Sequence, residues 1–227
     1  MSKLTLPLLD NSLYPQVWQQ QTFISPQNFL LAMLTGRITP DAQTFTKQLL
    51  ANDVYIEWVN TTVFGRYLHR QFTAYSQQTE DIFNTDMPAL FRQELTRHAQ
   101  YLPLEQILFF AGDLPKSVRQ TKLLTTTVNP ATVIANAKKM MEKKTTNGSE
   151  MIVNEIKITG KQVLGFPIRH NKRTSERLRN EVLVLDFQDL RLVNERTIED
   201  IKKSNIESMF IETTFIESML LRSYELR

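Results

Sequence analysis

The sequence contains no cysteine and only three histidines. The absence of cysteine excludes disulfide bonds, thiolate catalysis and every zinc site that needs a Cys ligand. The histidines, His69, His98 and His170, are scattered without the spacing of metal ligands, so we assign no metal. No apolar run approaches the length needed to cross a membrane.

The beginning of the chain lacks the form of a secretory signal peptide. It carries one lysine, a short apolar patch that Pro7 interrupts, and then Asp10. We therefore expect a soluble intracellular protein without a membrane partner. The 227 residues are enough to bury a hydrophobic core without disulfides or structural metals.

Positive charge is concentrated in one segment of the chain. Between Lys116 and Arg179 there are fourteen Lys and Arg residues against four Glu, while the whole chain has a net charge of +3. Such a segment favours a phosphate-bearing partner, either a nucleotide or a nucleic acid, although a solvated face has the same composition. Phe166 is its only aromatic residue, so it lacks the stacking platforms of single-strand-binding surfaces.

The first hundred residues show the periodicity of helices. Ser25-Pro26 has the pattern of an N-cap followed by a first-turn proline, and Gly36 marks the end of that helix. Thr39-Pro40 repeats the start signal for a second helix. Apolar residues at helical spacing predict two more helices, over residues 55–67 and 87–98.

After Tyr101 the pattern changes to short apolar runs rich in β-branched residues, which predict strands. The runs cover residues 106–112, 122–128, 151–158, 161–166, 180–187, 190–193 and 208–216. One helix interrupts them, with Asn129-Pro130 at its start and several lysines near its end. The expected fold class is α+β, with a helical region over residues 1–103 packed on a mainly antiparallel β-sheet core over residues 104–227.

A glutamate, Glu181, stands at the start of the most apolar of these runs. The run Val182-Leu183-Val184-Leu185 is typical of a strand buried on both faces, and alternation along it puts Arg179, Glu181 and Phe187 on one face. A carboxylate at the edge of a low-dielectric interior can stabilise a developing cation, as active sites require. The plainer interpretation is a strand-end glutamate that pairs with Arg179.

Three separated segments occur in a recognisable order. They are ILFFAGDLP at residues 107–115, LLTTTVNPATVIANAKK at 123–139 and RLRNEVLVLDFQDLRLV at 177–193. Together they resemble the ADP-ribosyltransferase fold of the arginine–serine–glutamate class, in particular its small phage and bacterial-toxin members. In that family the first strand ends in aromatic-Arg-Gly, the second carries Ser-Thr-Ser, and a later strand begins Glu/Gln-x-Glu-Val-Leu. The resemblance covers a little under half of the chain and implies a split β-sheet core.

The resemblance assigns a site to particular residues. Phe110-Ala111-Gly112 lies on the aromatic-Arg-Gly turn, Thr125-Thr126-Thr127 lies on Ser-Thr-Ser, and Glu181 lies on the catalytic glutamate. The resemblance implies that Glu181 stabilises the oxocarbenium-like transition state at the nicotinamide ribose of NAD, and that the threonine hydroxyls fix Glu181. The basic segment would meet the pyrophosphate. The three segments are therefore expected on adjacent strands.

Two residues depart from the family pattern. Ala111 replaces the arginine that organises the NAD-binding side of the cleft, so Arg119 or Lys122 would have to substitute for it. Arg179 replaces the Glu or Gln that engages the acceptor, and a guanidinium stays charged and cannot act as a base. It could instead pair with an acidic or phosphate-bearing acceptor.

The function that the resemblance implies is NAD-dependent mono-ADP-ribosylation of a protein or nucleic-acid acceptor, with release of nicotinamide. A small member without cysteine suits a phage or viral effector, one that acts in the host cytoplasm or is delivered with the virion. The alternative, which Ala111 and Arg179 favour, is a catalytically degraded member of the fold that serves as an interaction or structural module. Independently of the resemblance, the basic segment could bind nucleic acid, with an affinity that falls steeply as salt rises.

Overall fold

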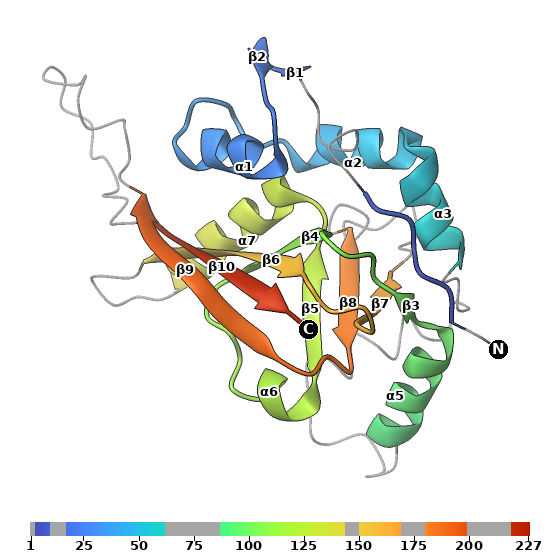
Figure 1. Ribbon diagram of the computed structural model, residues 1–227. Coiled ribbons are helices and arrows are strands. Elements are labelled where there is room, and N and C mark those ends of the chain that lie inside the picture. The colour runs from blue at the N-terminus through green and yellow to red at the C-terminus, as the bar shows by residue number, and fades with distance from the viewer. Residues whose placement is uncertain (1–2, 10–16, 62–86, 144–149, 169–179, 199–218) are drawn as a thin grey trace, which may run out of the picture.

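The protein combines α-helices with one large, mostly antiparallel β-sheet (Figure 1). The computed structural model describes residues 3–9, 17–61, 87–143, 150–168, 180–198 and 219–227. Within these ranges there are six helices, an eight-stranded sheet and a separate two-stranded ribbon. At this level the predicted arrangement of helices and a mainly antiparallel sheet is confirmed.

In the described part of the chain, four helices come before the central strands. They are α1 (Pro26–Leu34), α2 (Ala42–Ala51), α3 (Asp53–Thr61) and α5 (Met87–His98), and a ribbon of β1 (Val17–Trp18) and β2 (Gln21–Thr22) precedes them. Ser25 caps α1 as predicted, because its hydroxyl accepts a hydrogen bond from the Asn28 amide. α2 begins later than Thr39-Pro40 predicted, because the Asp41 carboxylate accepts hydrogen bonds from two amides of the first turn.

The large sheet has the strand order β3-β7-β8-β5-β4-β6-β10-β9. Its strands are β3 (Gln100–Tyr101), β4 (Ile107–Ala111), β5 (Leu123–Thr127), β6 (Met151–Ile158), β7 (Leu164–Pro167), β8 (Glu181–Leu185), β9 (Leu190–Ile198) and β10 (Met219–Leu226). Neighbouring strands are antiparallel except β6 and β10, which run parallel. The sequence did not predict β10, and the predicted strand at 208–216 lies outside the described residues.

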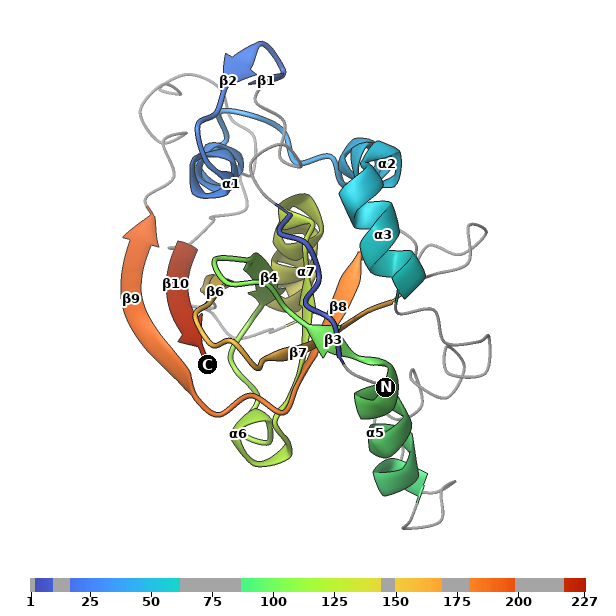
Figure 2. The ribbon, with the colours of Figure 1, turned by 45° about the vertical axis from the view of Figure 1, so that its right-hand side comes forward.

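The middle of the sheet is held by a very short junction. β4 and β5 share a single register pair, Phe109 with Thr127, whereas β4 pairs with β6 at five positions and β5 pairs with β8 at five. Figure 2 shows β9 and β10 on one side of this junction and β8 and β7 on the other. The sheet therefore consists of two halves that diverge from one point of contact.

Two helices lie in the connections between the central strands. The helix α6 (Val118–Thr121) links β4 to β5, and α7 (Pro130–Lys143) follows β5 and packs against β4 and β6. The predicted helix after Asn129-Pro130 is thus present. In Figures 1 and 2, α1, α2 and α3 lie at one end of the sheet, and α5 and α6 lie at the other.

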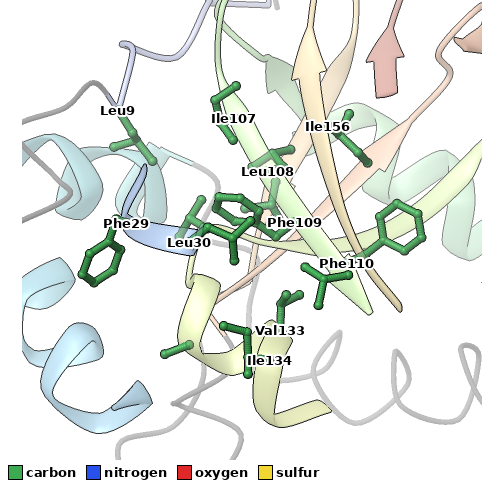
Figure 3. Packing of buried hydrophobic residues seen from close by; sticks show 14 of the residues in the cluster. Leu9, Phe29, Leu30, Ile107, Leu108, Phe109, Phe110, Val133, Ile134 and Ile156 are labelled. Carbon is green, nitrogen blue, oxygen red and sulfur yellow. The ribbon is translucent and has the colours of Figure 1, made fainter. Parts of the chain in front are cut away.

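The main hydrophobic core contains residues from both parts of the chain. Leu30 of α1, Phe109 of β4 and Ile134 of α7 are almost completely buried in one cluster, and Figure 3 shows side chains of these three elements together. A smaller cluster lies where α5 meets the outer strands and includes Leu95 and Leu183. Residues on both sides of the predicted boundary at 103 and 104 therefore pack in the same core.

Candidate functional site

The three segments that carry the family resemblance lie on adjacent strands. β4 ends at Ala111, β5 carries Thr125 to Thr127, and β8 begins at Glu181, and these strands are neighbours in the order β8-β5-β4. Thr127 is the register partner of both Glu181 on β8 and Phe109 on β4. The prediction that these segments come together is confirmed.

The register also fixes the face on which each side chain lies. Partners in a ladder project to the same face, and residues two apart in a strand project to the same face. Because Phe109, Thr127 and Glu181 form one row, Ala111 and Thr125 share their face. Positions 111, 125, 127 and 181, which the resemblance selects, thus lie on one face of three neighbouring strands.

Exposure differs among these positions. Thr125 is exposed, Ala111 and Glu181 are half-buried, and Thr127 is buried. Phe109 and Leu183 on the same face are buried, so solvent reaches this face at Thr125 and in part at Ala111 and Glu181.

Two residues of the threonine triplet, Thr126 and Thr127, tie β5 to β8. The Thr126 hydroxyl donates to the Val182 carbonyl oxygen at 2.7 Å, and the Thr127 hydroxyl donates to the Asn180 carbonyl oxygen at 3.1 Å. These two carbonyls flank Glu181 in the chain. Thr126 and Thr127 therefore link β5 to β8 by hydrogen bonds to the backbone on either side of the glutamate.

Glu181 lies at the margin of the smaller hydrophobic cluster. Leu183, two residues further along β8, and Ile168, whose amide donates to the Glu181 carbonyl oxygen at 2.8 Å, are both buried in that cluster. The prediction that Phe187 shares this face is wrong. β8 ends at Leu185 and Asp186 has a positive φ of 49°, so Phe187 turns into the main core instead.

The turn after β4 is built closely against its neighbours. Gly112 has a positive φ of 79°, and a Cβ at this position would lie 2.9 Å from the Met140 sulfur of α7. The Asn154 side chain on β6 donates to the carbonyl oxygens of Phe110 and Gly112. These contacts hold the end of β4 at Ala111, the position that the resemblance assigns to an arginine.

The two predicted substitutes for that arginine differ in their surroundings. Lys122 donates to the Gln188 carbonyl oxygen at 2.8 Å and lies 5.3 Å from the centroid of the Phe187 ring, so its ammonium group already has partners within the chain. Arg119 on α6 is exposed. Its charge acts on Tyr224, where burial raises the pKa of the hydroxyl and Arg222 and Arg119 oppose the rise. Arg179 lies outside the described residues.

Arg222 lies beside the turn after β4 and was not singled out from the sequence. Arg222 on β10 donates to Asp113 at 2.9 Å and to Glu195 at 2.6 Å, and both bonds are ion pairs. Asp113 directly follows Gly112, so Arg222 reaches the same turn from two strands away. The signal was absent because the strand that carries Arg222 was not predicted.

The start of α7 is capped from within the chain. The Asn129 side-chain oxygen accepts hydrogen bonds from the amides of Ala131 and Thr132 at 3.1 and 3.2 Å. Amides at helix N-termini often bind phosphate, but these two already have partners. Lys138 and Lys139 are exposed towards the other end of the helix, as expected for a solvated surface.

Asn180, the residue before Glu181, belongs to a buried polar network. Its side-chain oxygen accepts hydrogen bonds from the Thr46 hydroxyl at 2.8 Å and from the Asn129 amide nitrogen at 3.0 Å. Its own amide nitrogen donates to the Tyr55 hydroxyl at 3.3 Å. Local sequence patterns do not indicate this network, because Thr46 and Asn180 are 134 residues apart.

The described residues offer neither a metal site nor a membrane-spanning helix. In the ranges that the structure describes, no group of three or more His, Cys, Asp or Glu side chains is placed to hold a metal ion. Among the same residues, no helix has the length and the apolar character needed to cross a membrane.

The comparisons with known proteins do not assign a family. No family model, no curated protein and no solved structure matches this chain.

Proposed function

We propose that the protein is an NAD-dependent mono-ADP-ribosyltransferase in which Glu181 provides the catalytic carboxylate. One observation carries the proposal: positions 111, 125, 127 and 181, which the resemblance selects, share one face of three neighbouring strands. The single register pair between β4 and β5 also agrees with the split sheet of the ADP-ribosyltransferase fold. Neither feature follows from the local sequence of any one segment.

In the proposed reaction, the bond between C1′ of the ribose and the ring nitrogen of nicotinamide breaks. The electron pair stays with nicotinamide, which leaves as a neutral molecule. A nucleophile of a protein or nucleic-acid acceptor bonds to C1′ and releases its proton to solvent. The Glu181 carboxylate would face the positively charged ribose, where an oriented charge stabilises the transition state by several kcal/mol.

The other residues have supporting roles in this proposal. Thr125, which is exposed, would offer its hydroxyl to the substrate, while Thr126 and Thr127 hold the backbone around Glu181. Ala111 and Gly112 would form the wall at the end of β4. Arg119 is the better candidate for contact with the pyrophosphate, because the Lys122 ammonium already binds the Gln188 carbonyl oxygen.

The proposal is tested by nicotinamide release from NAD, measured with and without a cell extract as the source of acceptor. The purified chain should release nicotinamide, and Glu181→Gln should reduce the rate by about 100-fold or more while the fold is retained. Glu57→Gln on the exposed surface of α3 is the control and should behave like the wild type. A wild-type chain that releases no nicotinamide under either condition would refute the proposal.

A catalytically degraded member of the same fold is the second candidate. It is favoured by Ala111, which cannot donate a side-chain hydrogen bond, and by the hydroxyls of Thr126 and Thr127, which bind the backbone. Calorimetry distinguishes the two candidates, because the transferase must bind NAD and a degraded module need not. Absence of NAD binding in a folded chain would favour the interaction module.

A further inference from the structure

The residue before Glu181 is held in a conformation that its own backbone does not favour. Asn180 has a positive φ of 46° and is only 3% exposed. Left-handed backbone costs about 1–2 kcal/mol for residues other than glycine, although Asn tolerates it better than most. Surrounding contacts must therefore fix this conformation, which sets the direction in which β8 begins.

Those contacts come from four separate parts of the chain. Thr46 of α2 and Asn129 at the start of α7 donate to the Asn180 side-chain oxygen, and Tyr55 of α3 accepts from its amide nitrogen. The Thr127 hydroxyl of β5 donates to the Asn180 carbonyl oxygen. Both the oxygen and the nitrogen of the Asn180 side chain thus have hydrogen-bond partners inside the protein.

The members of the network also hold one another. Asn129 donates to the Thr46 hydroxyl oxygen at 3.3 Å and to the Ala42 carbonyl oxygen at 3.3 Å, while its own oxygen caps α7. Burial raises the pKa of Tyr55 to about 12, and its hydroxyl oxygen accepts the hydrogen bond from Asn180 in the neutral form. Buried networks of this kind specify one geometry because an unsatisfied polar group inside a protein is costly.

We infer that Thr46, Tyr55, Asn129 and Asn180 are positioning residues that orient the Glu181 carboxylate, and that α2 and α3 are therefore part of the functional unit. The inference rests on the proposed function, since it assigns the network to the same site. In physical terms, α2 and α3 hold Glu181, the first residue of β8, through their hydrogen bonds to Asn180. The helical region is then required for the work of the site and not only for stability.

Matched variants of Thr46 test the inference. Thr46→Ser keeps the hydroxyl, Thr46→Val removes it at nearly constant shape, and Leu49→Val destabilises the same helix without touching the network. Loss of a hydrogen bond that orients a functional group commonly lowers activity by about 10–100-fold. Thr46→Val should therefore lower kcat for nicotinamide release by at least about tenfold with KM for NAD within about twofold, while Thr46→Ser and Leu49→Val stay near the wild type.

The outcomes separate this inference from the proposed function. If Thr46→Val keeps wild-type kcat per folded molecule, the network is structural only and the inference is wrong. If the wild type itself has no turnover, the proposed function fails, and amide hydrogen exchange decides whether the network fixes β8. Faster exchange at residues 181–183 in Thr46→Val than in Leu49→Val would then support the positioning role, and equal exchange would overturn it.

Discussion

The hydrogen bonds of the Asn180 side chain set how much this residue contributes to the free energy of unfolding. The Asn180 side chain makes three hydrogen bonds, with Thr46, Asn129 and Tyr55, and all four residues are buried. A typical neutral hydrogen bond contributes about 1 kcal/mol to stability, so removing the side chain should cost about 3 kcal/mol. Asn180→Ala adds the strain of a positive φ, which raises the expected loss to about 4 kcal/mol.

Asn180→Gly separates the two contributions. Glycine adopts a positive φ without steric cost, so this variant loses the hydrogen bonds but not the backbone conformation, and it should be about 1 kcal/mol more stable than Asn180→Ala. The assay is urea unfolding followed by circular dichroism, with the free energy of unfolding extrapolated to water. Losses below about 1 kcal/mol for both variants, or a glycine variant less stable than the alanine variant, would refute the reasoning.

Three other predictions concern Glu155 on β6 and two residues, Ala111 and Gly112, at the end of β4. Burial raises the pKa of Glu155 above its ordinary value of 4.5. At a pH between the ordinary pKa and the higher pKa of the folded state, the folded protein holds a proton that the unfolded chain has lost. The free energy of unfolding should therefore fall as pH rises through this range. Glu155→Gln should abolish that fall, which urea titrations at several pH values would measure. The same pH dependence in the variant and in the wild type would contradict this prediction. If the proposed function is right, Ala111→Arg introduces the arginine that the resemblance expects at this half-buried position and should tighten NAD binding by about tenfold in calorimetry, whereas no change would argue against the assignment of this position. Gly112→Ala should lower the free energy of unfolding by about 1–2 kcal/mol because of its positive φ, with the mobile end of Met140 able to move aside. A variant as stable as the wild type would contradict the conformation of the turn.

The elements with strong local signals were predictable from the sequence. Ser25-Pro26 indicated the start of α1, and Asn129-Pro130 indicated the start of α7, because a capping side chain and a proline act within one turn. The apolar runs of β4, β5, β6 and β8 were equally clear, since strands in the middle of a sheet are buried on both faces. The neighbourhood of Ala111, Thr125 and Glu181 was predictable only through the order of the three segments.

The elements at the edges of the sheet were less predictable. β9 continues through seven exposed residues after Leu190, because an edge strand needs no apolar pattern. β10 contains Arg222, Ser223 and Glu225 and owes its place to pairing with β6 and β9 on either side. Its parallel alignment with β6 depends on residues far away in the chain.

The polar network illustrates the limit of local reasoning at the site itself. Thr46 looks like an ordinary residue of an amphipathic helix, and Asn180 looks like a turn residue before a strand. Their hydrogen bond joins residues 134 positions apart, so only the tertiary structure brings them together. Lys122 shows the reverse case, because a lysine that the sequence offers to a phosphate binds a carbonyl oxygen and an aromatic ring instead.

The most direct test of the central claim is a crystal structure of the protein with NAD bound. The account predicts that the nicotinamide ribose lies against the Glu181 carboxylate, with Thr125 on the adjacent strand in contact with the same substrate. NAD bound elsewhere on the molecule, with no contact to the face that carries positions 111, 125 and 181, would contradict it.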